Sequence, residues 1–190
     1  MKLPSSGHSR DYRAGIALGS NLGHSLFHLR KATAAILTLS SSSSEPITYS
    51  SSIYRTAPVD CPTGSGYFLN AVVEIEWHSG PEALWEKLQR LEFLAGRKKH
   101  PRRRHAPRPL DLDLLYLNSY QDSYQGVFGP VILPHPEIGK RRFVLTPLSD
   151  FAPHLFLPRE KRTVQEQLAL LPTIPSVRRI EQTLSSSSRD

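Results

Sequence analysis

Residues 68–77 read Phe-Leu-Asn-Ala-Val-Val-Glu-Ile-Glu-Trp, and this stretch decides how the chain folds. Apolar residues at alternate positions, from Leu69 to Ile75, indicate a strand with one face turned toward a core. The Thr-, Tyr-, Ser- and Ile-rich segment from Ile47 to Arg55 predicts a strand before it, so the two would pair as an antiparallel hairpin. A helix over about 81–95 is predicted next, because Pro81 stands at its first turn and Gly96 just beyond its end.

The flanking segments complete the fold. Ala14 to Leu18 is a short apolar run that predicts a buried strand, and Leu110 to Leu117 predicts another after the second helix. Ser20 and Asn21, which favour N-cap positions, precede a helical spacing of apolar residues over about 25–39. The order βαββαβ predicts an α+β fold, a ferredoxin-like antiparallel sheet with helices on it. Beyond residue 130 the chain is expected to be mostly loop, apart from a helix over about 163–171.

Composition favours one domain in a reducing compartment. The chain has 190 residues, 38% of them hydrophobic, and no long linker separates two periodic blocks. We expect one domain over residues 14–172, with residues 1–13 and 173–190 as flexible or peripheral termini. No apolar run is long enough for a membrane span, and the polar N-terminus lacks the apolar region of a secretory signal. Cys61 is the only cysteine, which fits a cytoplasmic protein.

The positive charge is concentrated in one segment. The net charge is +7. The segment from Arg97 to Arg108 contains seven Lys and Arg residues, counting both ends, and no acidic residue. A local cluster of this kind suits a compact polyanion such as a nucleoside triphosphate. The alternative is a protein that binds RNA or another anionic ligand through this segment. That alternative lacks the interleaved aromatic residues that stack on bases, and it leaves the acids that follow the segment unexplained.

Two of those acids alternate with leucines in Leu110-Asp111-Leu112-Asp113-Leu114. On a strand, side chains two positions apart share a face, so the two carboxylates would project together, about 7 Å apart at the backbone. Aspartate is depleted in strands and like charges repel, so something must favour the arrangement, and a divalent cation would do so. The alternative is an amphipathic strand whose exposed face carries two acids. Mg²⁺ takes one or two carboxylates and completes its shell with water and substrate phosphates. The pattern predicts a magnesium–nucleotide site, with two ions able to share both carboxylates.

The segment Arg104-His105-Ala106-Pro107-Arg108-Pro109-Leu110-Asp111-Leu112-Asp113 resembles the signature of the 6-hydroxymethyl-7,8-dihydropterin pyrophosphokinases. Further landmarks of that family occur in the same order over about residues 14–172. They are Ile16–Gly23, Tyr54–Pro58, Phe68–Val72, Gln89–Glu92 with Gly96 and Arg97, Leu133–Pro136, and Arg141–Phe143 before Leu145, Pro147 and Leu148. The family fold, a ferredoxin-like α/β/α sandwich, agrees with the fold predicted above.

The resemblance implies a role for each site residue. Asp111 and Asp113 would bind two Mg²⁺ ions that bridge the phosphates of the co-substrate ATP, and with Arg97 and Arg108 they would form the catalytic set. The ATP-binding positions are Gln89, Glu92, Arg97, Lys99, Arg108, His135 and Arg141. The pterin would stack between Phe68 and Phe143, while Asn70 and the backbone around Thr56, Pro58 and Val59 would read its hydrogen-bonding edge. His105 and Ala106 stand where the family usually has Trp and Gly. Lys99 stands where the family often has Arg, and lysine keeps the charge but cannot bind in bidentate fashion as arginine does.

The implied reaction is transfer of diphosphate from ATP to the pterin hydroxymethyl group, with AMP leaving, in folate biosynthesis. Catalysis would rest on positioning and charge neutralisation, and no residue stands out as a general base. A magnesium–nucleotide transferase that releases ADP is a further alternative. The expected partners are these small molecules, with no nucleic acid and no membrane, and the protein is expected to be a monomer.

Overall fold

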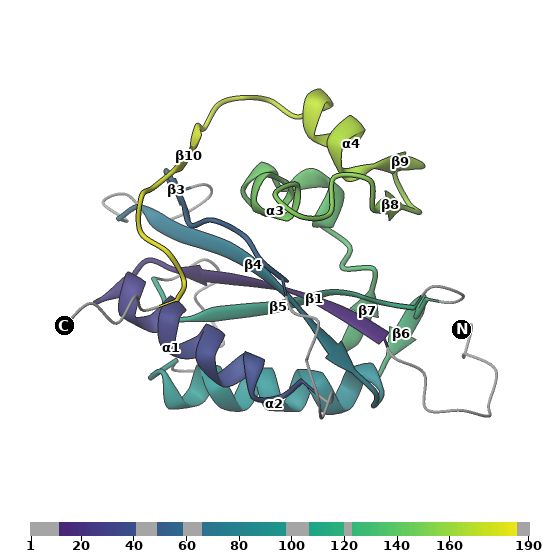
Figure 1. Ribbon diagram of the computed structural model, residues 1–190, viewed down its shortest axis with the longest axis horizontal. Coiled ribbons are helices and arrows are strands. Elements are labelled where there is room, and N and C mark those ends of the chain that lie inside the picture. The colour runs from purple at the N-terminus through teal and green to yellow at the C-terminus, as the bar shows by residue number, and fades with distance from the viewer. Residues whose placement is uncertain (1–11, 41–48, 59–65, 98–106, 120–122, 186–190) are drawn as a thin grey trace.

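The computed structural model describes residues 12–40, 49–58, 66–97, 107–119 and 123–185, and Figure 1 shows its helices and strands. A central sheet lies between two layers of helices. The elements in chain order are β1 (Tyr12–Ser20), α1 (Ser25–Leu37), β2 (Tyr49–Ser50), β3 (Tyr54–Thr56), β4 (Phe68–Trp77), α2 (Pro81–Leu94), β5 (Asp111–Asn118), β6 (Gly126–Phe128), β7 (Val131–Leu133), a 3₁₀ turn (Ile138–Lys140), α3 (Arg142–Leu148), β8 (Phe156–Leu157), β9 (Arg162–Thr163), α4 (Val164–Leu170) and β10 (Val177–Arg179).

The sheet is antiparallel throughout, with the strand order β10-β3-β4-β1-β5 and with β2 also pairing with β4. If β2 and β3 are counted as one position, the four main strands have the 2-3-1-4 order of a ferredoxin-like sheet. The predicted fold class is therefore confirmed. Strand β1 lies between β4 and β5, so its backbone is paired on both sides. Its side chains project toward the two layers of helices.

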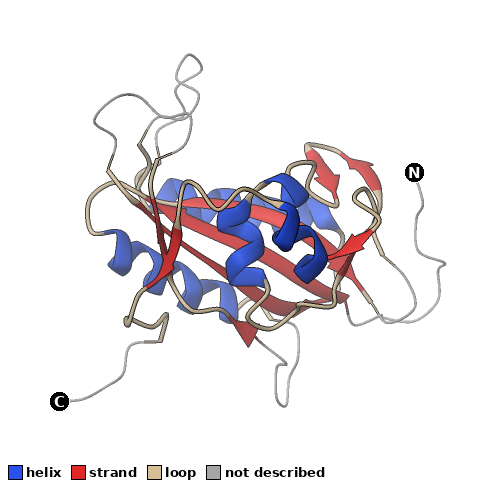
Figure 2. Ribbon diagram, turned by 90° about the horizontal axis from the view of Figure 1, so that it is seen from above, coloured by secondary structure: helices blue, strands red, loops and turns tan. Residues whose placement is uncertain are grey.

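Each face of the sheet has its own core, and the alternation of side chains along β1 explains the division. Ala14, Ile16 and Leu18 face α1 and α2 and are buried in the larger cluster, together with Leu29 and Leu88 of those helices. The opposite face packs against α3, α4 and the segment between them, where the smaller cluster includes Val72, Leu115, Tyr116, Val144 and Leu145. Figures 1 and 2 show the two helix layers on opposite sides of the sheet.

A β-bulge in β5 changes which side chains face which layer. Ile16 is opposite Leu114 and Gly15 is opposite Tyr116, so Leu115 has no partner on β1. The extra residue shifts the alternation. Before the bulge, the leucines from Leu110 to Leu114 enter the larger core and the two aspartates face the other way; after it, Tyr116 lies on the aspartates' face.

Three sequence predictions need correction. The segment from Ile47 to Arg55 was predicted as one strand but forms β2 and β3, separated at Ser51, whose hydroxyl accepts a hydrogen bond from the Val72 N–H (2.9 Å). The region after residue 130, expected to be mostly loop, contains the second strand of the β6–β7 hairpin, the whole β8–β9 hairpin, and α3 with Pro147 inside it. Neither Ser20 nor Asn21 caps α1, whose N-cap is His24 without a side-chain cap bond.

The C-terminal segment is part of the packed structure. Strand β10 pairs with β3, so that Val177 lies opposite Thr56. Further on, Arg30 of α1 donates to the Thr183 carbonyl (2.9 Å) and Leu184 is only 5% exposed within the larger core. Figure 1 shows this segment running from α4 past β3 to α1. The predicted boundary at residue 172 thus leaves out ordered residues. None of the helices in the described ranges has the length and apolar character needed to span a bilayer.

Candidate active site

The floor of the candidate site is the face of the sheet opposite α1 and α2, where β1 carries only small side chains from Gly15 to Gly19. On that face, Gly19 lies between Asn70 of β4 and Asp111 of β5, and Ala17 lies between Val72 and Asp113. The two aspartates therefore share one face of β5, as their spacing predicts. Both are partly exposed, so this end of the sheet is open to a ligand.

Arginines surround the two carboxylates. Arg97 donates to Asp111 Oδ1 (2.8 Å) and Arg108 to Asp111 Oδ2 (2.7 Å). Arg141 donates to Asp113 Oδ2 (3.2 Å), and His135 Nε2 lies 4.0 Å from the same oxygen. These side chains come from four separate segments of the chain. The fold therefore brings anionic and cationic groups together in the balance that a metal–phosphate ligand requires.

The end of α2 aims Arg97 at this cluster. Gly96 adopts a positive φ of 91°, the Gly96 N–H donates to the Phe93 carbonyl and the Arg97 N–H donates to the Glu92 carbonyl (both 3.0 Å). This is a Schellman motif, which reverses the chain direction after a helix. The reversal returns the Arg97 guanidinium to α2, where it contacts both Glu92 and Asp111.

Glu92 links α2 to the strand that carries the aspartates. Its Oε1 accepts hydrogen bonds from Arg97 and from the Leu112 backbone N–H (2.7 Å), and its Oε2 accepts from Gln89 (2.9 Å). Leu112 stands between the two aspartates, so this bond fixes the backbone on which they are mounted. The side chain of Glu92 is 2% exposed. Its oxygens are thus committed to the protein rather than open to a ligand.

Burial sets the protonation of two groups. It raises the pKa of Glu92 to about 7, against the opposing effects of the Leu112 N–H and Arg97. It also lowers the pKa of the His135 imidazole below its ordinary value, although Asp113 opposes this shift. Because the Glu137 N–H donates to His135 Nδ1 (3.2 Å), that nitrogen is the acceptor and Nε2 carries the proton of the neutral ring.

Asn21 fastens the segment that leads into β5. Its Oδ1 accepts the Arg108 N–H (2.8 Å), and its own N–H donates to the Arg108 carbonyl (3.2 Å). The residue predicted to cap α1 therefore holds the backbone of Arg108 instead. This pair of bonds fixes the backbone of Arg108. Arg108 is three positions before Asp111 in the sequence, and their side chains form an ion pair.

A cavity of about 230 Å³ adjoins the charged cluster. Gln89, Arg97, Asp113 and His135 are among its lining residues, and Trp85 adds an aromatic wall. The apolar remainder comes from β5 and from the segment around β7, namely Leu112, Leu114, Pro130, Val131, Ile132 and Pro136. The cavity thus joins apolar walls, suited to a flat base, with charged groups at one end, suited to phosphates.

The residues predicted to bind a pterin lie on the other side of Gly19. Asn70 Nδ2 donates to Thr56 Oγ1 (2.8 Å), and both residues are buried, at 6% and 3% exposure. Phe68 is opposite Thr56 and is partly exposed, as are Pro58 and Phe143. Phe143 lies in the first turn of α3, and the Arg141 guanidinium lies 5.9 Å from the centre of its ring. Val59 and Lys99 lie outside the described residues, as do His105 and Ala106.

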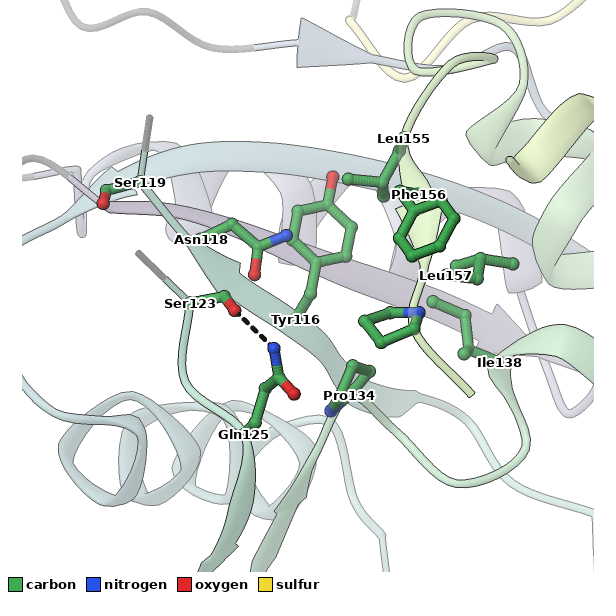
Figure 3. A pocket seen from close by; sticks show the side chains of 11 residues that line it. Tyr116, Asn118, Ser119, Ser123, Gln125, Pro134, Ile138, Leu155, Phe156 and Leu157 are labelled. Atoms are coloured by element: carbon green, nitrogen blue, oxygen red, sulfur yellow. Dashed lines mark hydrogen bonds between the residues drawn. The ribbon is translucent and has the colours of Figure 1, made fainter. Parts of the chain in front are cut away.

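A second cavity, of about 340 Å³, lies beyond the bulge on β5 (Figure 3). It is lined by Tyr116, Asn118, Ser119, Ser123, Gln125, Pro134, Ile138, Leu155, Phe156, Leu157 and Pro158. Although it is the larger of the two, none of these described lining residues carries a formal charge at neutral pH. It therefore lacks the groups that grip phosphates or metal ions, and the charged cluster at Asp111 and Asp113 is the better candidate for an active site.

No group of three or more His, Cys, Asp and Glu side chains is placed to hold a metal ion in the part of the chain that the structure describes. Among the described residues, Asp111 and Asp113 are the two that offer carboxylates in the open site. This pair fits Mg²⁺, which needs only one or two protein carboxylates when phosphates supply the other ligands. A structural metal with four protein ligands does not fit this donor set.

Comparison with known proteins decides the family. The model of the 7,8-dihydro-6-hydroxymethylpterin-pyrophosphokinase (HPPK) family matches residues 15–153. The chain belongs to the HPPK family. The match covers β1 to the end of α3 and includes every residue of the charged cluster.

Relatives of the HPPK family agree over most of the chain. The 2-amino-4-hydroxy-6-hydroxymethyldihydropteridine pyrophosphokinase of Methylorubrum extorquens is 35% identical over 159 residues, 84% of this chain and 93% of its own length. The enzyme of the same name from Bacillus subtilis is 38% identical over 137 residues, which are 72% and 76% of the two chains. The mitochondrial folate synthesis bifunctional protein of Arabidopsis thaliana is 37% identical over 142 residues, 75% of this chain but only 24% of that protein.

Solved structures confirm the fold. A crystal structure of Plasmodium falciparum HPPK-DHPS with pteroate superposes with a TM-score of 0.60 at 14% identity, covering 87% of this chain and 43% of the other. The chain therefore spans less than half of that protein, and at this identity the likeness concerns the fold.

Several residues of this HPPK site escaped the sequence analysis. The αL turn at Gly96 and the long-range bond of Asn21 matter because of where the chain goes next, which a local pattern does not reveal. The prediction for Gly96 identified the end of the helix but not that the turn delivers Arg97. The signal for Gly19 was present, since every β1 residue on this face between Gly15 and Gly19 is small.

Proposed function

We propose that this chain transfers diphosphate from ATP to the hydroxymethyl group of 6-hydroxymethyl-7,8-dihydropterin, releasing AMP, as a step of folate synthesis. The observation that carries the proposal is the paired Asp111 and Asp113 on one face of β5, ringed by Arg97, Arg108 and Arg141, in a chain of the HPPK family. The names of the single-domain relatives support the same activity.

ATP would occupy the cavity beside the cluster. Its base lies against the apolar walls near Trp85 and Leu114, within reach of the Gln89 amide and His135, while its phosphates reach the arginines. Asp111 and Asp113 would hold two Mg²⁺ ions, which neutralise and orient the phosphates when bound. The arginines that now balance the aspartates are then free to pair with phosphate oxygens, to which guanidinium groups bind in bidentate fashion. Lys99 is proposed to add a further cation.

Glu92 contributes differently from the ATP contact expected of it. Its oxygens are filled by Arg97, Gln89 and the Leu112 N–H, and it is almost inaccessible. We therefore assign Glu92 a positioning role. It holds the strand between the aspartates and one face of Arg97, so the charged groups keep their spacing before ATP arrives.

The pterin would lie on the Asn70 side of Gly19. Asn70 Nδ2 donates one of its two hydrogens to Thr56, which fixes the orientation of the amide, and the amide oxygen would accept a hydrogen bond from the pterin edge. The backbone near Pro58 and Val59 would complete this edge, and the rings of Phe68 and Phe143 would stack on the two faces of the pterin. Offset stacking adds about 0.5–1.5 kcal/mol beyond the burial of area.

The chemistry is an in-line displacement. The hydroxymethyl oxygen forms a bond to the β-phosphorus, the bond from that phosphorus to the α,β-bridging oxygen breaks, and AMP leaves with that oxygen and its electron pair. The hydroxyl proton is lost in the same exchange, and no side chain is assigned as its acceptor. Arg97 and Arg108 would stabilise negative charge on the phosphates, so the chain contributes mainly positioning and electrostatics.

Product analysis tests the proposal. Purified protein with ATP, Mg²⁺ and the hydroxymethyl dihydropterin should release one AMP for each pterin diphosphate formed, as measured by ion-exchange chromatography, and chelation of divalent metal with EDTA should stop the reaction. Formation of ADP would favour the phosphotransferase alternative, and a folded protein that forms no nucleotide product would contradict the proposal. The RNA-binding alternative receives no support from the relatives. We further expect the protein to be cytoplasmic and monomeric. Size-exclusion chromatography with light scattering measures the oligomeric state.

A further inference from the structure

We propose that Gly19 determines which substrate can react, because its missing side chain leaves a short path over the sheet from the pterin to the phosphates. The proposal rests on the proposed function. It concerns one position on β1, and no side-chain contact to ATP or to the metal ions is involved.

Gly19 lies between the two halves of the site. In the register of the sheet, Asn70 on β4 is paired with it on one side and Asp111 on β5 on the other. Neighbouring strands are about 4.8 Å apart, so the group that reads the pterin and the group that holds the metal are separated by about two strand spacings. The strand between them is β1, at Gly19.

The reacting arm of the substrate must cross this position. If the pterin edge is held by Asn70 and the phosphates by the groups around Asp111, the hydroxymethyl carbon and oxygen have to extend from one to the other. The arm is only two heavy atoms long, so it has to run close to the floor of the site. A side chain at residue 19 would stand on that floor, whereas a glycine leaves it free.

The space above Gly19 is open to a methyl group and to little more. An added Cβ would lie 3.4 Å from Asn70 Oδ1 and 3.8 Å from Asp111 Cβ, both ordinary van der Waals distances, and no other atom of the described residues lies within 4 Å. Gly19 is partly exposed and its φ is not in the left-handed region. The backbone therefore does not require glycine here, and packing within the protein does not require it either.

Gly15, four positions earlier on the same face, provides the contrast. A Cβ there would lie 2.2 Å from Cε1 of the Tyr116 ring, which fills the space above it. Gly15 is thus explained by packing against a side chain of the protein, while at Gly19 the corresponding space holds nothing from the described protein. On this proposal, the glycine at position 19 keeps that space free for a ligand.

The test is Gly19→Ala, which adds one methyl group to the floor without a clash. The matched control is Gly80→Ala, where an added Cβ would meet only Glu82 Oε2 at 3.6 Å, before α2 and outside the site. Two binding probes are compared by calorimetry, each in the presence of Mg²⁺ and the uncleavable α,β-methylene-ATP. One is 6-hydroxymethyl-7,8-dihydropterin and the other is 7,8-dihydropterin, which has the same ring without the arm.

Gly19→Ala should weaken binding of the hydroxymethyl compound at least tenfold and that of the armless ring less than twofold. Turnover, as kcat/KM for the pterin, should fall at least tenfold, while the affinity for α,β-methylene-ATP and the Tm stay at the wild-type values. Gly80→Ala should match the wild type in the binding and turnover measurements; because Gly80 is the N-cap of α2, where alanine is less favoured, its Tm is not used as a control.

Equal losses for both pterins, turnover within threefold of the wild type, or a fall in Tm that accompanies the lost activity would each overturn the assignment. A failure here is distinguishable from failure of the proposed function. If the wild type forms AMP and pterin diphosphate and Gly19→Ala does so equally well, only the role of Gly19 is wrong. If the wild type neither binds the pterins nor forms AMP, both proposals are overturned.

Discussion

The free energy of unfolding of Glu92→Gln, relative to that of the wild type, should increase as the pH rises. Burial raises the pKa of Glu92 from 4.5 to about 7 in the folded protein. The folded state then binds more protons than the unfolded state between these two values, so the free energy of unfolding falls as pH rises through that window. Glutamine keeps an oxygen for the Leu112 N–H but does not titrate, so Glu92→Gln lacks this loss.

The size of the effect follows from the shift. A difference of about 2.5 pKa units corresponds to about 3 kcal/mol, since one unit is worth about 1.4 kcal/mol. Most of it, about 2–3 kcal/mol, should accumulate between pH 5 and pH 8.5. The quantity to follow is the stability of Glu92→Gln minus that of the wild type, because titration of other groups cancels in this difference.

Urea denaturation followed by circular dichroism, at several pH values and with EDTA to exclude divalent metal, measures that difference. The matched control is Glu86→Gln, which makes the same chemical change on the exposed face of the same helix. A difference for Glu92→Gln that stays constant within about 0.5 kcal/mol would show that Arg97 keeps Glu92 ionised at every pH. The inference that burial raises the pKa of Glu92 would then be wrong.

Three further substitutions test the site and the fold. Asp113→Ala should lower kcat about 100-fold or more while leaving the fold intact, because it removes a proposed metal ligand and only a partly exposed ion pair with Arg141. Steady-state AMP release and circular dichroism measure the two effects, and wild-type turnover would contradict the metal assignment. Thr56→Val should cost about 1–3 kcal/mol of stability, because it leaves the buried Asn70 amide without its acceptor. It should also raise KM for the pterin and not for ATP, and an equal rise in both would contradict the placement of the pterin beside Asn70. Gly15→Ala should destabilise the protein by about 1–3 kcal/mol through overpacking against the Tyr116 ring; thermal unfolding measures this, and an unchanged Tm would contradict the close packing seen there.

The parts of the fold that follow one period along the chain could be predicted from the sequence. The alternation in Phe68–Trp77 identified β4 to the residue, and the alternation of Leu and Asp correctly placed the two carboxylates on the face opposite the core. Pro81 and Gly96 bounded α2 to within one residue. Each of these signals is local, since the residues that determine the structure are neighbours in the sequence.

What the sequence did not reveal depends on distant contacts. The bulge at Leu115 interrupts an apolar run whose residues are all buried, so the pattern carries no mark of the shift. Helix α3 contains Pro147 and follows two other prolines, which favour a loop, yet its apolar face packs on Val72 of β4. Asn21 has the residue type of a helix cap, but its acceptor oxygen is used by a backbone group 87 positions away. In each case tertiary packing overrode a local preference.

The central claim is that the two aspartates on β5 hold divalent metal together with the phosphates of ATP, and Mn²⁺ as a paramagnetic substitute for Mg²⁺ tests it most directly. Electron paramagnetic resonance should show two bound Mn²⁺ ions per wild-type chain in the presence of α,β-methylene-ATP, and this binding should be lost in Asp111→Ala and in Asp113→Ala while both variants remain folded. Mn²⁺ binding that is unchanged in both variants would contradict the account.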